Sequence, residues 1–285
     1  MTRLKLTRHS AGWGVLFLLC LGGCASLQQP SATPLPPLPS KKQWKVAHYL
    51  FIADVDLPRD QPLLKELEGL QEQVCKELQL PLSNSLIYVY LFADRPQYEQ
   101  YMQAHFKNLP SRRAFFVARS DERRGDELMV YTYWGDRIGE DLRHELTHAH
   151  LHSVLKHVPM WLDEGLAEYF EVPPSWNGLN YRHLSAMRSQ PGVPWNPNLN
   201  RLERLTQVRE MTPTDYRESW AWAHFMLRGN PQAKTILLGY LQQLRSTKDP
   251  GPLEALLTAA FPSPEAAVKA HITRLEAITR SFPAQ

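Results

Sequence analysis

The sequence predicts an α+β fold, in which a small mixed β-sheet comes first and an all-helical part follows. Segments that are rich in Val, Ile, Tyr and Phe and alternate in polarity occur only before residue 135. After Gly135 the apolar residues recur at helical spacing instead. Of the 285 residues, 43% are hydrophobic and 21% are charged, which is ordinary globular composition. A disordered chain and a protein with several membrane spans are therefore both disfavoured.

The first part alternates strands with helices. The strands are predicted at residues 43–56, 85–92, 114–119 and 127–134. The helices between them are predicted at residues 63–80, where leucines recur at helical spacing, and at residues 96–106. This order indicates a small sheet with helices packed on it.

The second part is helical. Two helices are predicted at residues 136–155 and 159–171, joined by a short turn. A connection rich in Pro, Trp and Asn follows at 173–200 around a short helix, and the remainder to residue 282 is helical. We therefore predict a sheet subdomain at residues 43–172, which includes the first two of these helices, and a helical C-terminal subdomain at residues 173–285.

Residues 1–23 have the pattern of a secretory signal, because a basic start precedes an apolar stretch. This stretch is shorter than the roughly 20 residues that a membrane-spanning helix needs. The segment ends Leu-Gly-Gly before Cys24, which resembles the bacterial lipobox. The resemblance implies cleavage before Cys24 and attachment of a lipid to its thiol. A permanent membrane anchor and an ordinary soluble secreted protein are the alternatives.

Residues 24–42 are predicted to be a spacer, because five prolines in a nearly uncharged segment favour extended, semi-rigid chain. Such a spacer would tether the protein to a membrane of the bacterial envelope, facing away from the cytosol, through the lipid on Cys24. Cys20 would leave with the signal, so that only Cys75 remains and no internal disulfide is expected.

The charge balance argues against nucleic acid as a partner. Three of the 32 basic residues, Arg3, Lys5 and Arg8, lie in the predicted signal, which leaves 29 basic against 29 acidic residues. Proteins that bind nucleic acid usually carry positive charge on one face or in a cluster. No dense run of Lys and Arg follows residue 8.

The first helix of the second part contains the motif His144-Glu145-Leu-Thr-His148. Residues four apart lie on one helical face, with Cβ atoms about 5–6 Å apart, so both imidazoles can reach one zinc ion. Glu145 is rotated from His144 by about 100° and points beside the metal. It is therefore placed to take a proton from a water that the metal activates.

The next helix supplies acids for the same site. Glu164 and Glu168 lie on one face, and the short turn can fold this helix back beside the first. Glu164 would complete a His₂Glu set of three ligands, which leaves a fourth position for water. Glu168, one turn later, would accept the free N–H of a ligand imidazole and fix its tautomer.

Together the two helices resemble those of the gluzincin metallopeptidases. In that family a His-Glu-x-x-His helix is followed by a helix with Asn-Glu-Gly or a close variant, and here Asp163-Glu164-Gly165 follows. The resemblance implies a zincin-like fold, Glu164 as the third zinc ligand, and Glu168 as the acid beside a zinc-bound histidine. Fifteen residues separate His148 from Glu164, fewer than in well-known members, which fits a compact member.

A further helix that begins near Tyr216 is similar to the Tyr-Glu-Lys-Gly helix start of the aminopeptidase branch of that family. There the tyrosine steadies the tetrahedral oxyanion, and the resemblance implies this role for Tyr216. An ordinary tyrosine at a helix start is the alternative. His224 is the rival donor, and a packed core histidine is the other interpretation of that residue.

These features predict a zinc-dependent metallopeptidase that cuts peptide or protein substrates at the cell envelope, with Glu145 as general base. An endopeptidase is favoured, because the sequence contains no Gly-x-Met-Glu-Asn strand for capture of a substrate amino terminus. One rival hypothesis is a non-catalytic envelope lipoprotein that uses the same fold for binding or assembly. Another is a zinc hydrolase of a non-peptide amide or ester.

Overall fold

The computed structural model describes residues 35–58, 61–121, 125–188 and 195–280. The described residues belong to one compact unit, Leu35–Gln285, which we call the folded body. The predicted signal, Cys24 and most of the predicted spacer lie outside the described residues. Within the described residues, no helix has both the length and the apolar character needed to span a membrane.

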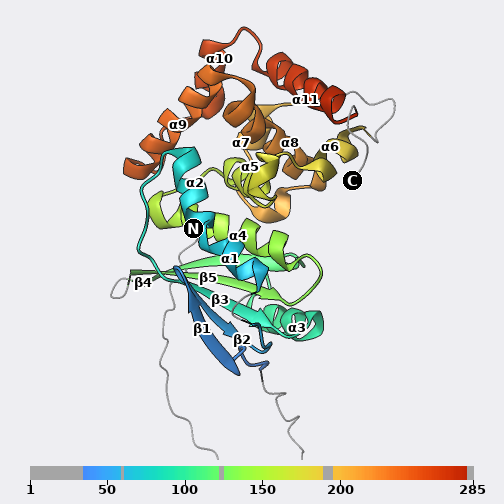
Figure 1. The fold of residues 1–285 in the computed structure, drawn as a ribbon. Coiled ribbons are helices and arrows are strands. Elements are labelled where there is room, and N and C mark those ends of the chain that lie inside the picture. Colours follow the sequence, from blue (N-terminus) through green and yellow to red (C-terminus); the bar gives the residue numbers. More distant parts are fainter. Residues whose placement is uncertain (1–34, 59–60, 122–124, 189–194, 281–285) are drawn as a thin grey trace, which may run out of the picture. The chain divides into compact units, whose positions relative to one another are not determined.

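A five-stranded mixed sheet forms the first part of the folded body (Figure 1). The strands are β1 (Lys42–Val46), β2 (Tyr49–Ala53), β3 (Ile87–Phe92), β4 (Ala114–Asp121) and β5 (Gly125–Tyr133). Their order is β1-β2-β3-β5-β4, in which β2, β3 and β5 are parallel and the two outer strands pair antiparallel. With helices after it, this sheet confirms the predicted α+β class.

Two predicted elements are each divided in the structure. The strand predicted at 43–56 is the hairpin β1–β2, whose turn begins at Ala47 with a φ of 48°. The helix predicted at 63–80 consists of α1 (Pro62–Glu68) and α2 (Leu70–Leu78), which meet at Gly69. In both places the apolar periodicity continues across the break, so the pattern alone does not show it.

The two faces of the sheet carry different helices. On one face, aliphatic side chains of β3 and β5 such as Val89 and Val130 pack with α1, α2 and α4 (Ile138–Val154). On the other face, aromatic side chains such as Phe92 and Tyr131 pack with α3 (Arg95–His105). This alternation follows from the two-residue period of a strand. It places α4, with its His-Glu-x-x-His motif, directly on the sheet (Figure 1).

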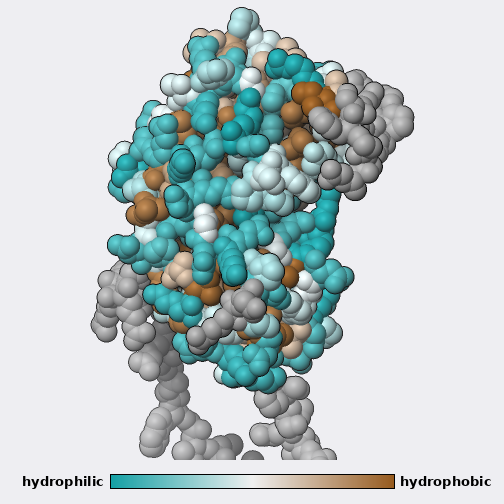
Figure 2. Space-filling view, in the orientation of Figure 1, coloured by the Kyte–Doolittle hydropathy of each residue, from teal (hydrophilic) through white to brown (hydrophobic). Residues whose placement is uncertain are grey.

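Helices make up the remainder of the folded body. They are α5 (Met160–Phe170), η1 (Pro174–Trp176), α6 (Tyr181–Arg188), α7 (Leu199–Glu203), η2 (Val208–Glu210), α8 (Pro213–His224), η3 (Phe225–Gly229), α9 (Pro231–Ser246), α10 (Leu253–Ala260) and α11 (Pro264–Arg280). On the face drawn in Figure 2, hydrophobic residues form only small, separate patches. Most of the large apolar side chains, including Trp161, Trp220 and Trp222, are buried instead.

Helix α5 packs against both α4 and α8. A Cβ atom at Gly165 would lie only 2.5 Å from the carbonyl oxygen of Ser219 on α8. Glycine is therefore needed at this position for the two helices to approach so closely. Because Glu164 precedes this glycine, the same close approach brings the start of α8 beside Glu164.

Candidate metal and catalytic site

His144 and His148 of α4 and Glu164 of α5 come together as the sequence predicts. The Nε2 atoms of His144 and His148 lie 3.3 and 3.7 Å from the same oxygen, Oε2 of Glu164. One ligand atom from each residue can be chosen so that all three lie within 4.8 Å of one another. Ligand atoms at about 2.0–2.1 Å from a tetrahedral zinc ion are about 3.3 Å apart. This donor set therefore fits zinc in type and spacing.

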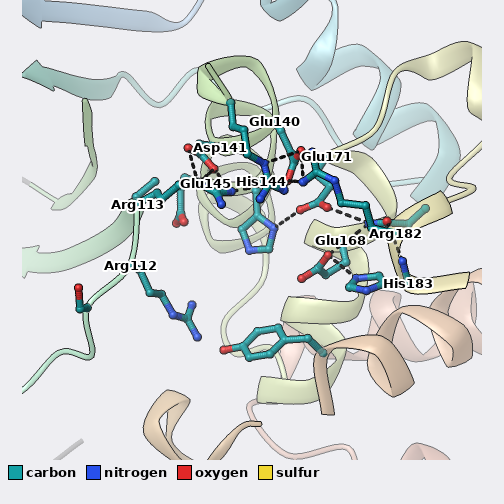
Figure 3. Close-up of a pocket in the computed structure, with 15 residues that line it drawn as sticks. Arg112, Arg113, Glu140, Asp141, His144, Glu145, Glu168, Glu171, Arg182 and His183 are labelled. Carbon is teal, nitrogen blue, oxygen red and sulfur yellow. Dashed lines mark hydrogen bonds and ion pairs between the residues drawn. The ribbon is translucent and has the colours of Figure 1, made fainter. Parts of the chain in front are cut away.

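The opposite nitrogen of each imidazole faces another acid. His144 Nδ1 lies 2.9 Å from Oε2 of Glu171 (Figure 3). His148 Nδ1 lies 2.9 Å from Oδ1 of Asp163, close enough for an ion pair but without the alignment of a hydrogen bond. Carboxylates in these positions fix the tautomer and the ring orientation of a metal-binding histidine. Each ring is thus oriented with Nε2 toward Glu164.

Glu168 was predicted to orient a ligand imidazole, and in the structure its hydrogen bonds go to other residues. Its carboxylate contacts Nε2 of His183 at 2.6 Å and Nδ2 of Asn180 at 3.4 Å (Figure 3). The acid on His144 is Glu171, one residue beyond the end of α5, whose other oxygen accepts a hydrogen bond of 2.8 Å from Asn180. Glu168 and Glu171 are three residues apart and share a helical face, so helical spacing alone did not distinguish them.

The charges of the site depend on one another. Burial opposes protonation of both imidazoles, but Glu164 and Glu171 raise the pKa of His144 well above its usual value. Asp163 and Glu164 likewise raise the pKa of His148 to about 10. Burial raises the pKa of Glu164, yet the two imidazoles outweigh it and hold that pKa well below the usual value. A metal ion would therefore bind with release of protons from these imidazoles.

Glu145 lines a cavity of about 430 Å³ together with His144. The cavity is also lined by Ser111, Arg112, Arg113, Ala114, Arg137, Glu140, Asp141, Glu168, Glu171, Asn180, Arg182, His183 and Tyr216. In Figure 3, Arg112 and Arg113 lie on one side of this cavity, and Glu168, Arg182 and His183 lie on the other. Burial raises the pKa of Glu145, although His144 and His148 oppose this shift. A carboxylate of raised pKa is suited to accept and return a proton.

Tyr216 and Arg112 both approach Oε1, the oxygen of Glu164 that faces away from the imidazoles. The Tyr216 hydroxyl donates to Oε1 at 3.5 Å, and Arg112 Nη1 donates to it at 3.4 Å. The Arg112 guanidinium also lies over the Tyr216 ring, 5.0 Å from its centre. Tyr216 is thus near the predicted centre. Arg112 was missed, because it precedes β4 and no motif links it to the two helices.

His224 lies elsewhere. Its Nδ1 is 2.9 Å from Nε2 of His271 on α11, and the residue is 3% exposed. Burial, followed by the repulsion that a protonated His271 and Arg228 would exert, lowers the pKa of His224 to about 3. His224 is not among the residues that line the cavity around Glu145. The packed-histidine interpretation therefore fits it better than the role of oxyanion donor.

Part of the chain matches a known family. Residues 140–251 match the model of a family described as a protein of unknown function (DUF1570). The matched segment begins in the first turn of α4, ends beyond α9 and contains all the predicted metal and catalytic residues. It covers less than half of the chain and leaves out the sheet. No curated protein matches the chain.

Proposed function

We propose that the protein is a zinc-dependent hydrolase of peptide bonds. One observation carries the proposal: two imidazole Nε2 atoms converge on one carboxylate oxygen of Glu164, while a separate acid faces each Nδ1 atom. A second acid at the other ring nitrogen is typical of histidines that bind a metal, and three protein ligands with an open fourth position are typical of catalytic zinc sites. His144, His148 and Glu164 would hold the ion.

Zinc in such a site polarises a carbonyl group and lowers the pKa of a water to about 7. The protein's own part is to move the proton. Glu145 would accept a proton from the attacking water as the new C–O bond forms. It would then give that proton to the nitrogen as the C–N bond breaks.

Tyr216 would stabilise negative charge, and Arg112 would position Tyr216. Both groups donate toward Oε1 of Glu164, and they line the same cavity as Glu145. In the substrate complex the Tyr216 hydroxyl would donate to the oxygen of the attacked carbonyl as its charge develops. Arg112 would hold the Tyr216 ring in place through the contact of its guanidinium with the ring face.

The proposal includes a location. Cleavage before Cys24 and lipid attachment to its thiol would tether the enzyme to a membrane of the bacterial envelope, where peptide or protein substrates would reach it. Support comes from the sequence pattern of residues 1–42 alone. Mass spectrometry of the mature protein tests this part, since an unmodified Cys24 or another N-terminus would contradict it.

Zinc content and cleavage test the function itself. The folded body is expected to bind about one zinc ion per chain and to cleave members of a broad peptide library, and a chelator should stop cleavage. Glu164→Ala should release the metal, because one of three ligands is lost. His157→Ala is the matched control, since His157 is exposed. Full metal content in Glu164→Ala, or a zinc-loaded folded body that cleaves nothing, would contradict the proposal.

A further inference from the structure

A second cavity adjoins the candidate catalytic cavity. It has a volume of about 330 Å³. Ser111 and Arg112 line both cavities. The guanidinium of Arg112 is 5.0 Å from the centre of the Tyr216 ring, in the catalytic cavity, and 5.6 Å from the centre of the Phe115 ring, in the second cavity. Arg112 therefore stands at the border of the two cavities.

The wall of the second cavity is mainly apolar. It is formed by α3, by the segment that leads from α3 to β4, and by the start of β4. The large apolar residues in it are Met102, Phe106, Leu109 and Phe115. Glu99, Gln103 and Lys107 also belong to its lining. Ligand cavities commonly combine an apolar lining with a few polar groups.

One polar group in this wall lacks a partner. Tyr98 is 1% exposed, and its hydroxyl makes no hydrogen bond with any residue that the structure describes. A buried hydroxyl of this kind is costly to leave unpaired. This hydroxyl oxygen has almost no accessible surface, so a ligand in the cavity reaches it only if neighbouring side chains move.

We infer that this cavity is a specificity pocket for an apolar side chain of the peptide substrate, at a position next to the bond that is cut. The inference rests on the proposed peptidase function. The volume is at the lower end of the range for ligand cavities, which suits one side chain of the size of Phe, Leu or Met. Because Arg112 borders both cavities and lines the catalytic cavity together with Glu145, a side chain in this pocket would extend from a substrate backbone in the catalytic cavity.

The pocket is tested by filling it. A peptide library is digested with the folded body, with Leu109→Trp and with Leu256→Trp. Leu256 is the matched control, because it is 40% exposed on α10 and lines neither cavity. At one position next to the cut, the unchanged protein should prefer Phe, Leu or Met over Gly by about 10-fold or more. Leu109→Trp should remove most of this preference, and Leu256→Trp should retain it.

A second variant guards against misfolding of the first. Phe106→Ala enlarges the pocket and should shift the preference toward Trp. The inference is overturned if the unchanged protein has no apolar preference next to the cut. It is also overturned if both pocket variants fold, as judged by circular dichroism, and cleave with the original preference.

A binding measurement separates this inference from the function on which it rests. The probe is N-acetyl-4-fluorophenylalaninamide, observed by fluorine NMR with the folded body. Binding should be lost in Leu109→Trp and kept in Leu256→Trp. If the probe binds in this way but no peptide is cleaved, the pocket stands and the peptidase proposal fails. If peptides are cleaved without apolar preference and the probe does not bind, the pocket fails alone.

Discussion

Two pairs of histidines in the described part of the molecule have opposite surroundings, and all four rings are buried or nearly so. His144 and His148 lie on α4 with ring centres 4.9 Å apart, and His224 and His271 lie on α8 and α11 with ring centres 5.1 Å apart. The first pair faces the carboxylates of α5 and of the residue after it. In the second pair the two rings contact each other, through Nδ1 of one and Nε2 of the other.

The pKa values move in opposite directions as a result. Burial lowers the pKa of all four histidines, but carboxylates reverse this effect in the first pair and raise the pKa of His148 to about 10. In the second pair burial acts together with positive neighbours, and the pKa values fall to about 3 for His224 and about 4 for His271. Buried imidazoles without acidic neighbours thus remain neutral and contact each other. Imidazoles surrounded by carboxylates form a site that favours positive charge, such as a metal ion.

The largest expected effect is on zinc content. Replacing a histidine of the first pair should release the metal, whereas replacing a histidine of the second pair should not. His148→Ala should abolish zinc binding and peptide cleavage, because it removes one of three ligands. His271→Ala should leave one zinc ion per chain, although the protein loses some stability. Zinc content by plasma mass spectrometry checks both. Equal zinc loss in the two variants would mean that the comparison does not identify the metal site.

Glu145→Gln separates catalysis from metal binding. The amide has nearly the same size as the carboxylate but does not accept the proton from water, so activity should fall by about 10²–10⁴-fold. Zinc content and the unfolding curve should stay as in the unchanged protein, since Glu145 is not one of the three ligands. A variant that is fully active with zinc bound would remove Glu145 from the proposed role. One that loses zinc would show that Glu145 serves the metal instead.

Much of the fold could be predicted from the sequence, because local patterns determine it. The helices predicted at 136–155 and 159–171 are α4 and α5, within two residues at each end. The spacing of four within the motif and the short turn to α5 were sufficient to place His144, His148 and Glu164 together. The breaks at Ala47 and Gly69 were missed, because apolar periodicity continues through them.

The remaining parts of the site depend on packing between distant segments. Arg112 is 52 residues before Glu164 and reaches it from the segment that precedes β4, which no local spacing predicts. Glu171 contacts His144 because the end of α5 lies beside α4. The motif provided two acids on one face, Glu164 and Glu168, and tertiary packing decided that Glu171 rather than Glu168 meets the imidazole.

The acids around the imidazoles give a smaller expected effect. Glu171→Gln and Asp163→Asn should each weaken zinc binding by about 10–100-fold, because the ligand histidines lose the carboxylates that orient them. Glu168→Gln should weaken it less, since Glu168 contacts His183 and Asn180. Competition with a chelator of known affinity measures all three. A larger effect of Glu168→Gln than of Glu171→Gln would restore the original prediction for Glu168.

The smallest effect concerns the second histidine pair and acid pH. In the folded protein the pKa values of His224 and His271 are lowered to about 3 and about 4, whereas an unfolded histidine titrates near ~6.5. As the pH falls from about 6.5 to about 4, the unfolded chain therefore binds protons that the folded protein does not. Within this pH window, each histidine lowers the free energy of unfolding by at most about 1.4 kcal/mol per pH unit. Above the window, no such stability is lost.

Urea unfolding of the zinc-free folded body at several pH values between 7 and 4.5 measures this slope, with His271→Gln compared against His157→Gln. His157 is exposed, so this variant controls for the loss of a histidine at the surface. In His271→Gln the unfolded chain has one histidine fewer to protonate as the pH falls. The free energy of unfolding should therefore decrease less steeply with falling pH, by about the contribution of one proton. The first histidine pair titrates in all three proteins and cancels in the comparison. If the free energy of unfolding changes with pH equally in the unchanged protein and both variants, then His224 and His271 are not held neutral in the folded protein. The difference in pKa between the two pairs would then be contradicted.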